Sequence, residues 1–118
     1  MSAAPAADSG AREVLVRFDE LPWTDAAPGL RTKAVIRGAQ RARLLDLSHG
    51  FVEPDWCTRG HALHVLDGRC TLATRDGSVA LEKGDVGLIP GGEPHGHKLV
   101  LGPGERARLL VFDEAEPP

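Results

Sequence analysis

Four side chains that can bind a metal ion stand in two short segments of the chain. The first segment holds a carboxylate, a thiol and an imidazole, at Asp55, Cys57 and His61. The second holds an imidazole at His95, shortly after a Pro-Gly-Gly turn. Carboxylate, thiolate and imidazole are the protein ligands that suit a divalent transition metal. If the two segments meet in space, the sequence predicts a metal site made of all four side chains.

Strand geometry connects these spacings to one face of a sheet. Side chains at positions i and i+2 of a strand share a face, so Asp55 and Cys57 point the same way if their segment is extended. His61 keeps this phase if the bend at Arg59 and Gly60 does not shift it. Asp55 has two possible roles: it binds the metal itself, or its carboxylate orients a histidine that does.

His97 shares a face with His95, by the same rule of alternation. We assign His97 to proton transfer, because an unperturbed imidazole titrates near neutral pH. A ligand role and a position at the rim of the site are the alternatives. Arg59 lies inside the first segment and is expected to contact a substrate.

A bound cation would explain why such groups are buried together. Burying a carboxylate and several imidazoles without a partner costs several kcal/mol. A cation removes that cost and favours the thiolate form of Cys57. Three or four protein ligands leave room for water or a substrate, which is typical of a catalytic site. The alternative for Cys57 is a buried thiol that packs in the core and has no functional role.

Two pairs of arginines also have the spacing of a shared strand face. They are Arg41 with Arg43, and Arg106 with Arg108. A pair that faced inward could bind a substrate carboxylate through paired hydrogen bonds. A solvated outer face is the expectation for both pairs.

The bulk properties exclude several classes of protein. The chain has 118 residues, a net charge of −3 and no run of Lys or Arg, so nucleic acid is not an expected partner. No apolar run has the length of a membrane span, and the N-terminus lacks the pattern of a signal peptide. Cys57 and Cys70 are too few for a disulfide scaffold. These features predict a soluble, cytoplasmic protein with reduced cysteines.

The abundance of turn residues favours an all-β fold, since the chain contains 14 Gly and 9 Pro. Asp67-Gly68 is expected to be the turn of a two-residue hairpin. A small antiparallel β-barrel is predicted over residues 12–113, between a flexible tail at 1–11 and a loose tail at 114–118. The expected strands cover residues 13–18, 31–36, 41–47, 61–66, 69–74, 79–81, 86–89, 95–101 and 106–112.

The first segment resembles the first motif of the cupin superfamily, H-x-H-x3–4-E-x6-G. Asp55 and Cys57 stand where that motif has its histidines, and His61 stands where it has its glutamate. Gly68 matches the closing glycine. The run Asp55-Trp56-Cys57-x2-Gly60-His61 is similar to a subgroup of short bacterial single-domain cupins.

The second segment resembles the second cupin motif, G-x5-P-x-G-x2-H-x3-N. Gly84, Pro90, Gly92 and His95 match this pattern, whereas Leu99 replaces its asparagine. The resemblance implies a jelly-roll barrel, or double-stranded β-helix, that commonly forms homodimers. The expected strand at residues 14–18 would then be an edge for pairing between subunits.

Together, the residues and the resemblance favour a metal-dependent enzyme that acts on a small polar molecule. The mixed ligand set favours Zn²⁺ over Fe²⁺, Ni²⁺ or Mn²⁺. Lewis-acid chemistry would make the protein an isomerase, lyase, cyclase or hydrolase. The alternatives are a module that senses or binds a small ligand or a metal, a metal-dependent dioxygenase, and a barrel whose metal is structural or absent.

Overall fold

The computed structural model describes residues 14–115, so the predicted tail at 1–11 and residues 116–118 lie outside the described residues. In the described part, eight strands and two short 3-10 turns follow one another. They are η1 (Phe18–Glu20), β1 (Thr24–Ala27), β2 (Leu30–Arg37), β3 (Gln40–Leu47), β4 (His61–Thr74), β5 (Gly77–Glu82), β6 (Val86–Ile89), η2 (Glu93–His95), β7 (His97–Val100) and β8 (Ala107–Glu114). No helix among these residues has the length and apolar character needed to span a bilayer.

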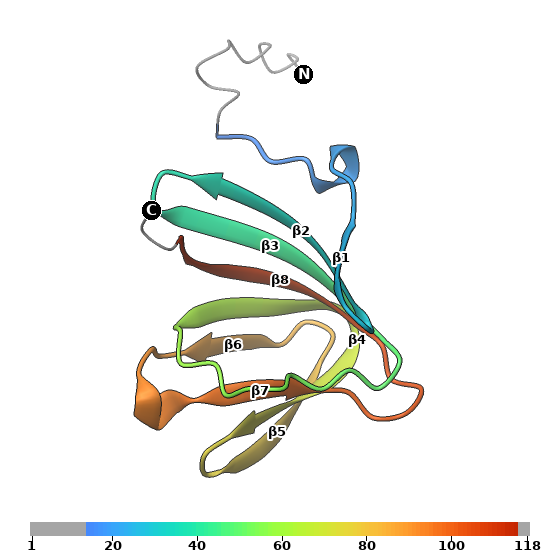
Figure 1. Cartoon of the computed structure of the whole chain (residues 1–118), viewed down its shortest axis with the longest axis vertical. Helices are drawn as coiled ribbons and strands as arrows, with labels where there is room; N and C mark the ends of the chain where they lie inside the picture. The colour runs from blue at the N-terminus through green and yellow to red at the C-terminus, as the bar shows by residue number, and fades with distance from the viewer. Residues whose placement is uncertain (1–13, 116–118) are drawn as a thin grey trace, which may run out of the picture.

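The strands form one curled antiparallel sheet with the order β1-β2-β3-β8-β4-β5. Strand β4 joins two halves of this sheet. Its first half pairs with β8 and β6, and its second half pairs with β5 and β7. Figure 1 shows β2, β3 and β8 on one side of the fold and β5 and β7 on the other. The predicted all-β antiparallel barrel is therefore confirmed.

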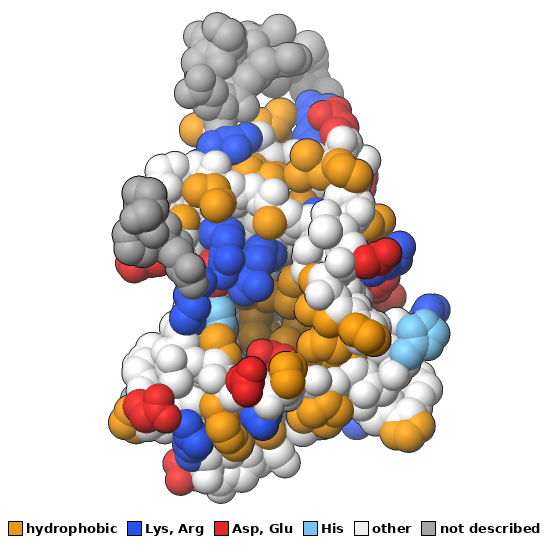
Figure 2. All heavy atoms as spheres, in the orientation of Figure 1, with side chains coloured by type: hydrophobic (Ala, Val, Ile, Leu, Met, Phe, Trp, Pro, Cys, Tyr) orange, Lys and Arg blue, Asp and Glu red, His pale blue; other side chains and the backbone are white. Residues whose placement is uncertain are grey.

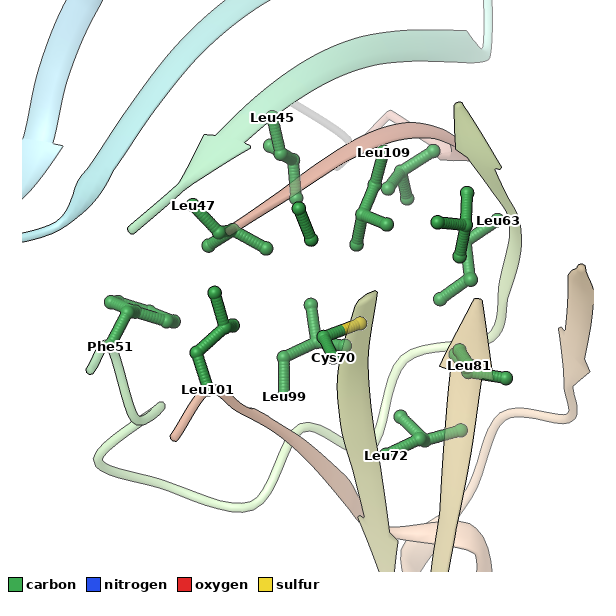
Figure 3. Packing of buried hydrophobic residues seen from close by; sticks show 13 residues of the cluster. Leu45, Leu47, Phe51, Leu63, Cys70, Leu72, Leu81, Leu99, Leu101 and Leu109 are labelled. Atoms are coloured by element: carbon green, nitrogen blue, oxygen red, sulfur yellow. The ribbon is translucent and has the colours of Figure 1, made fainter. Parts of the chain in front are cut away.

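The hydrophobic core fills one end of the space between the two halves. Leu45 and Leu47 of β3 point inward together with Leu109 of β8, because alternate residues of a strand share a face. Figure 3 shows these leucines facing side chains that include Phe51, Leu99, Leu101 and Cys70. The full removal of such a side chain from water contributes about 1.5–3 kcal/mol each.

The prediction of a hairpin at Asp67-Gly68 is wrong, because β4 runs through both residues. The pair instead follows a bulge, because the register of β4 against β8 shifts between Val65 and Asp67, and Asp67 and Gly68 then pair with Arg108 and Ala107 of β8. Gly68 has a φ of +76°, and an added Cβ there would lie 1.9 Å from the carbonyl oxygen of Arg106. Gly68 therefore has the positive φ that a hairpin turn would need, but uses it in the bend by which β4 passes from one half of the sheet to the other.

The prediction of a strand at residues 13–18 is also wrong for the part that is described. Residues 14–17 form no strand, and η1 follows them. The edge beside β2 is taken by β1, so the segment before η1 has no edge there to pair with. The side chain of Trp23 lies on the outer face of the sheet, with Lys33 and Arg31 at 4.7 and 4.8 Å from its ring centre.

The C-terminal strand extends one residue beyond the predicted boundary at 113. Glu114 is the last residue of β8, where it pairs with Gln40 of β3. The N–H of Ala115 then donates to the carbonyl of Ala39 at 2.8 Å. This end of the β3–β8 pair is thus fixed by backbone pairing, which matters because the preceding residue of β8, Asp113, belongs to the candidate site.

Candidate metal centre

Three side chains that can bind a metal meet at the opposite end of the interior from the core. The ligand atoms of Cys57, His61 and His97 all lie within 4.8 Å of one another. Cys57 Sγ is 3.2 Å from His61 Nε2, and the rings of His61 and His97 meet edge to face at 5.1 Å. Among residues 14–115, no other set of three Cys, His, Asp or Glu side chains brings its possible ligand atoms this close together.

Backbone pairing places Cys57 directly opposite His97. The N–H of Cys57 donates to the carbonyl of His97 at 2.9 Å, and the N–H of His97 donates back at 3.0 Å. Two residues paired in this way present their side chains on the same face. His61 comes from a third place, the first residue of β4, where it pairs with Ile89 of β6.

The two histidines are buried and suited to metal binding as neutral rings. His97 is 2% exposed, and the side chain of His61 is 8% exposed. Burial, followed by the nearby imidazole of His97, lowers the pKa of His61 to about 4. His97 Nδ1 lies 3.2 Å from the carbonyl oxygen of His95. A proton donated there leaves Nε2 as the ligand atom.

A buried carboxylate, that of Asp113 in β8, lies behind His61. Its Oδ2 is 3.1 Å from His61 Nδ1, the ring nitrogen that faces away from Cys57. The two atoms are close, although they are not aligned as a hydrogen bond. A carboxylate in this position fixes the orientation of a metal-binding histidine and raises its basicity.

Two arginines of β3 hold Asp113 in its charged form. Arg41 donates to both carboxylate oxygens, at 2.7 and 2.6 Å, and Arg43 contacts Oδ2 at 3.2 Å. Burial by itself would raise the pKa of Asp113, but the Arg41 hydrogen bond and the charges of Arg43 and Arg41 outweigh it and lower that pKa. The carboxylate is 1% exposed, so these contacts are shielded from solvent.

The expectation that Arg41 and Arg43 lie on a solvated outer face is wrong. Their side chains are 21% and 24% exposed and point into the interior. The reason is the register of β3, because Arg41 and Arg43 alternate in phase with the inward-facing Leu45 and Leu47. The other pair does face outward, where Arg108 lies beside Asp46 and the ring of Trp23.

The structure does not bring Asp55 and His95 to the three-residue group. Asp55 is exposed in a bend, so the extended segment assumed for the alternation with Cys57 is interrupted. His95 is exposed at the end of η2. A 3-10 turn repeats every three residues, so it breaks the strand alternation that was expected to place His95 and His97 on one face. Only His97, the first residue of β7, faces the interior.

The two residues that the sequence assigned to catalysis have different positions. His97 is one of the three clustered ligand side chains rather than a separate base beside them. Arg59 is half-buried and donates from Nη2 to the carbonyl of Glu114. Burial is the main cause of the lowered pKa values of Arg43 and His61, and the charge of Arg59 adds to it in both cases.

The interior is open at this end of the fold. Ile36 is 56% exposed, although its register opposite Arg41 places it on the inner face. Figure 2 shows the surface hollowed near its middle, with Lys and Arg side chains and a histidine at the edge and hydrophobic side chains within. A cleft of about 1280 Å³ lies mainly on the outer face of the sheet, where Ala62, Leu88 and Phe112 line it, and it reaches the edge of the site at Arg59, His61 and Asp113.

The three-residue group fits a tetrahedral metal ion. Zinc binds sulfur at about 2.3 Å and imidazole nitrogen at about 2.0–2.1 Å, which sets its ligand atoms roughly 3.3–3.6 Å apart in a tetrahedron. The 3.2 Å between Cys57 Sγ and His61 Nε2 is shorter than this spacing by only a few tenths of an ångström. The other separations are at most 4.8 Å, so small side-chain rotations close the set.

Sequence reasoning missed Asp113, the carboxylate behind His61. A signal was present, because Asp113 follows Leu109 and Val111 at intervals of two residues and so shares their inward phase. A charged residue at an inward position of an apolar strand indicates a buried partner or a functional site. Its partner Arg41 is 72 residues away in the sequence, and no local pattern connects the two.

Comparisons with known proteins identify the fold. No protein-family model and no curated protein matches the chain. Among solved structures, the polyketide cyclase RemF from Streptomyces resistomycificus is 25% identical with a TM-score of 0.73, over 88% of this chain and 81% of that one. A sugar phosphate isomerase from a cupin superfamily, from Silicibacter pomeroyi, is 18% identical with a TM-score of 0.72, over 87% and 76%. KdgF from Halomonas sp. is 21% identical with a TM-score of 0.67, over 83% and 90%.

Proposed function

The chain is a cupin by its fold, and we propose that it is a metal-dependent enzyme acting on a small polar organic molecule. The observation that carries this proposal is the convergence of Cys57, His61 and His97 at the open end of the interior. Three protein ligands leave coordination positions for water or a substrate, which distinguishes a catalytic site from a closed structural one.

Zinc is the metal that we propose for this site. One thiolate and two imidazoles form a soft to intermediate ligand set, which suits Zn²⁺ and, less well, Fe²⁺ or Ni²⁺. Manganese prefers oxygen ligands, and Asp55 lies outside the group. When bound, such an ion supplies Lewis-acid chemistry, polarising a carbonyl or lowering the pKa of a bound water.

The surrounding side chains have separate roles in this proposal. Asp113 holds His61 in the orientation for binding, and Arg41 holds Asp113. Arg59 and Arg43 lie toward the open end, where they contact the substrate. The hydrophobic wall beside them excludes water from the part of the substrate that does not react.

We propose an isomerase, cyclase, lyase or hydrolase reaction rather than an oxygenation. The structural neighbours include a polyketide cyclase and a sugar phosphate isomerase, which supports the first two classes. A thiolate ligand at an open iron site is itself exposed to oxidation, which argues against a dioxygenase.

Metal content tests this proposal and separates the two possible ligand sets. Purified wild-type protein is expected to bind about one zinc per chain, and Cys57→Ala/His97→Ala is expected to bind none. The matched control is Asp55→Ala/His95→Ala, which removes two exposed candidate ligands and is expected to retain the metal. Equal metal content in both double variants, measured by elemental analysis, would refute the three-residue site.

We further propose that the protein is cytoplasmic and that it acts as a homodimer without nucleic acid. Cys57 and Cys70 are both free thiols, which supports a reducing compartment. The net charge of −3 and the absence of a run of Lys or Arg in the sequence argue against a nucleic-acid partner. The outer face of the sheet, discussed below, supports the dimer.

A further inference from the structure

We infer that Arg43, together with Arg59, forms an anion-binding subsite beside the metal group, and that the substrate is a small organic anion carrying a carboxylate or phosphate. This inference rests on the proposed function, since it names the substrate class of the same site. It depends on the orientation of the Arg43 side chain, on the hydrogen bonds of its guanidinium group and on the charged groups near it.

Arg43 points into the open end of the interior. It pairs with Val111 of β8, whose side chain is 2% exposed and faces the core. Its own side chain keeps 24% of its surface exposed, so it is neither solvated outside nor sealed inside. Leu45, two residues further along β3, starts the hydrophobic core below it. An anion that enters the open end therefore meets Arg43 before the core.

The hydrogen bonds of Arg43 are incomplete. Arg41 already supplies the two short contacts to Asp113, at 2.7 and 2.6 Å, whereas Arg43 makes one longer contact at 3.2 Å. The Nε of Arg43 is buried and has no hydrogen-bond partner. A guanidinium has five donors in a planar fork. The contact with Asp113 uses one donor of Nη2 and the buried Nε is out of reach, so the donors that serve a carboxylate or phosphate are the others on the two Nη atoms.

Other cationic groups lie close to Arg43. The guanidinium groups of Arg41 and Arg59 act on its charge, as do the carboxylate of Asp113 and the thiol of Cys57 in the opposite sense. A divalent metal ion bound by Cys57, His61 and His97 would add positive charge beside them. Cationic groups in a partly enclosed site attract anions and strengthen their hydrogen bonds.

The subsite is close enough to the three-residue group of Cys57, His61 and His97 for one small molecule to contact both. A single atom, Asp113 Oδ2, is 3.2 Å from Arg43 Nη2 and 3.1 Å from His61 Nδ1. A carboxylate or phosphate bound by Arg43 therefore places the adjoining atoms of its own molecule near Cys57 and His97. A long or bulky ligand is not needed to reach both.

Anion titrations of the Co²⁺-loaded protein test this inference. Thiolate and imidazole ligands give Co²⁺ a visible spectrum that changes when a molecule binds near it. Malonate and inorganic phosphate are the two probes, which distinguish a carboxylate from a phosphate ligand, and uncharged malonamide is the matched control. At least one anion is expected to give a saturable spectral change, and malonamide is expected to give none.

Variants assign the binding to Arg43. Arg43→Gln is expected to weaken the anion at least tenfold, while Co²⁺ affinity changes less than threefold. The control is Arg31→Gln, because Arg31 also contacts a carboxylate, that of Asp46, but lies on the outer face. The Arg31→Gln variant is expected to bind the anion as the wild type does. Arg43→Lys keeps the charge without the fork, and an intermediate loss is expected, which gives a reading if Arg43→Gln fails to fold.

The outcomes separate this inference from the proposed function. If the wild type binds Co²⁺ but neither anion, or if the arginine variants bind the anion equally well, the anion subsite is refuted and the metal site stands. If the wild type binds no metal, calorimetric titration of the metal-free protein with phosphate decides the subsite alone. Loss of that binding in Arg43→Gln would support the subsite, and unchanged binding would overturn it.

Discussion

At the scale of single residues, the candidate site depends on a chain of contacts rather than on its three ligands alone. Arg41 holds Asp113, Asp113 lies against His61, and His61 contacts Cys57. Each partner restricts the rotation of the next, so the ligand atoms are brought together before a metal ion binds. Buried networks of this kind are costly when a single member is removed.

Replacement of Asp113 by asparagine tests this chain of contacts. Asp113→Asn keeps the shape of the side chain but removes the charge behind His61, so metal affinity is expected to fall about 10–100-fold. Competition with a chelator of known affinity measures the change. Asp46→Asn serves as the control, because Asp46 also pairs with an arginine but lies on the outer face of β3. A similar affinity in both variants would contradict the role of Asp113.

Cys70 gives the protein a predicted weakness at alkaline pH. Burial, with a smaller effect from Glu105, raises the pKa of Cys70 from 9.0 to about 11. The unfolded chain therefore loses this proton first as the pH rises, and the stability that the protonated thiol contributes is lost between pH 9 and 11. The free energy of unfolding is expected to fall by roughly 2 kcal/mol between pH 8.5 and 10.5 from this group.

Urea unfolding at several pH values checks the alkaline prediction. The Cys70→Ala variant lacks the titrating thiol, so its stability is expected to change less over this range than that of the wild type. The difference between the two proteins removes the contributions of other groups. A wild type and a variant that lose the same stability would show that Cys70 does not titrate as expected.

At the scale of elements, β4 organises the fold and the site. Its first residue, His61, belongs to the metal group, and its second half contributes Cys70 and Leu72 to the core. The bulge between Val65 and Asp67, followed by the positive φ of Gly68, lets one strand serve both halves of the sheet. The position of His61 relative to the rest of the site therefore depends on a bend several residues away in the same strand.

A pair of glycine variants tests the bend of β4 at Gly68. Gly68→Ala places a Cβ 1.9 Å from the carbonyl oxygen of Arg106, in addition to the strain of its φ of +76°. Gly104→Ala has nearly the same φ, +78°, with nothing within 4 Å. We expect Gly104→Ala to cost about 1–2 kcal/mol and Gly68→Ala at least about 2 kcal/mol more. Chemical denaturation measures both, and equal losses would mean that the close approach is unimportant.

At the scale of the whole molecule, the outer face of the sheet carries an apolar row that no described segment fully covers. Register places Phe112 of β8 beside Ala62 of β4, and Ala62 beside Leu88 of β6. Phe112 is 48% exposed and Leu88 is 79% exposed. Neighbouring exposed apolar side chains of this kind mark a protein interface. The strand at residues 14–18, first expected to pair two subunits, does not form, so this face is the surface that we propose for the homodimer.

A single charge on this face is expected to separate the subunits. The wild type is predicted to have the mass of a dimer by light scattering, and Leu88→Asp is predicted to weaken association at least 100-fold. Val79→Asp is the matched control, because Val79 is 52% exposed on β5, in the other half of the sheet. A monomeric wild type, or equal dissociation in both variants, would contradict the proposed face.

The sequence by itself determined the fold class, most strand positions and two of the three clustered candidate ligands, Cys57 and His61. These features follow from local rules, because alternation, turn residues and motif spacing act over a few neighbouring residues. The predictions for His95 and for the hairpin at Asp67-Gly68 relied on the same rules and differ from the structure. The outward face expected for Arg43 followed instead from the usual solvation of charged side chains, whereas strand alternation placed it inward.

The tertiary structure decided the rest of the site. A 3-10 turn before β7 took His95 off the inner face that it was expected to share with His97, and the pairing of β3 with β8 joined Arg41 to Asp113 across 72 residues. Neither effect has a local signature, because a broken alternation and a distant ion pair are set by which strands become neighbours. Local chemistry therefore specified what could bind a metal, and the pairing of distant strands specified which of those side chains meet.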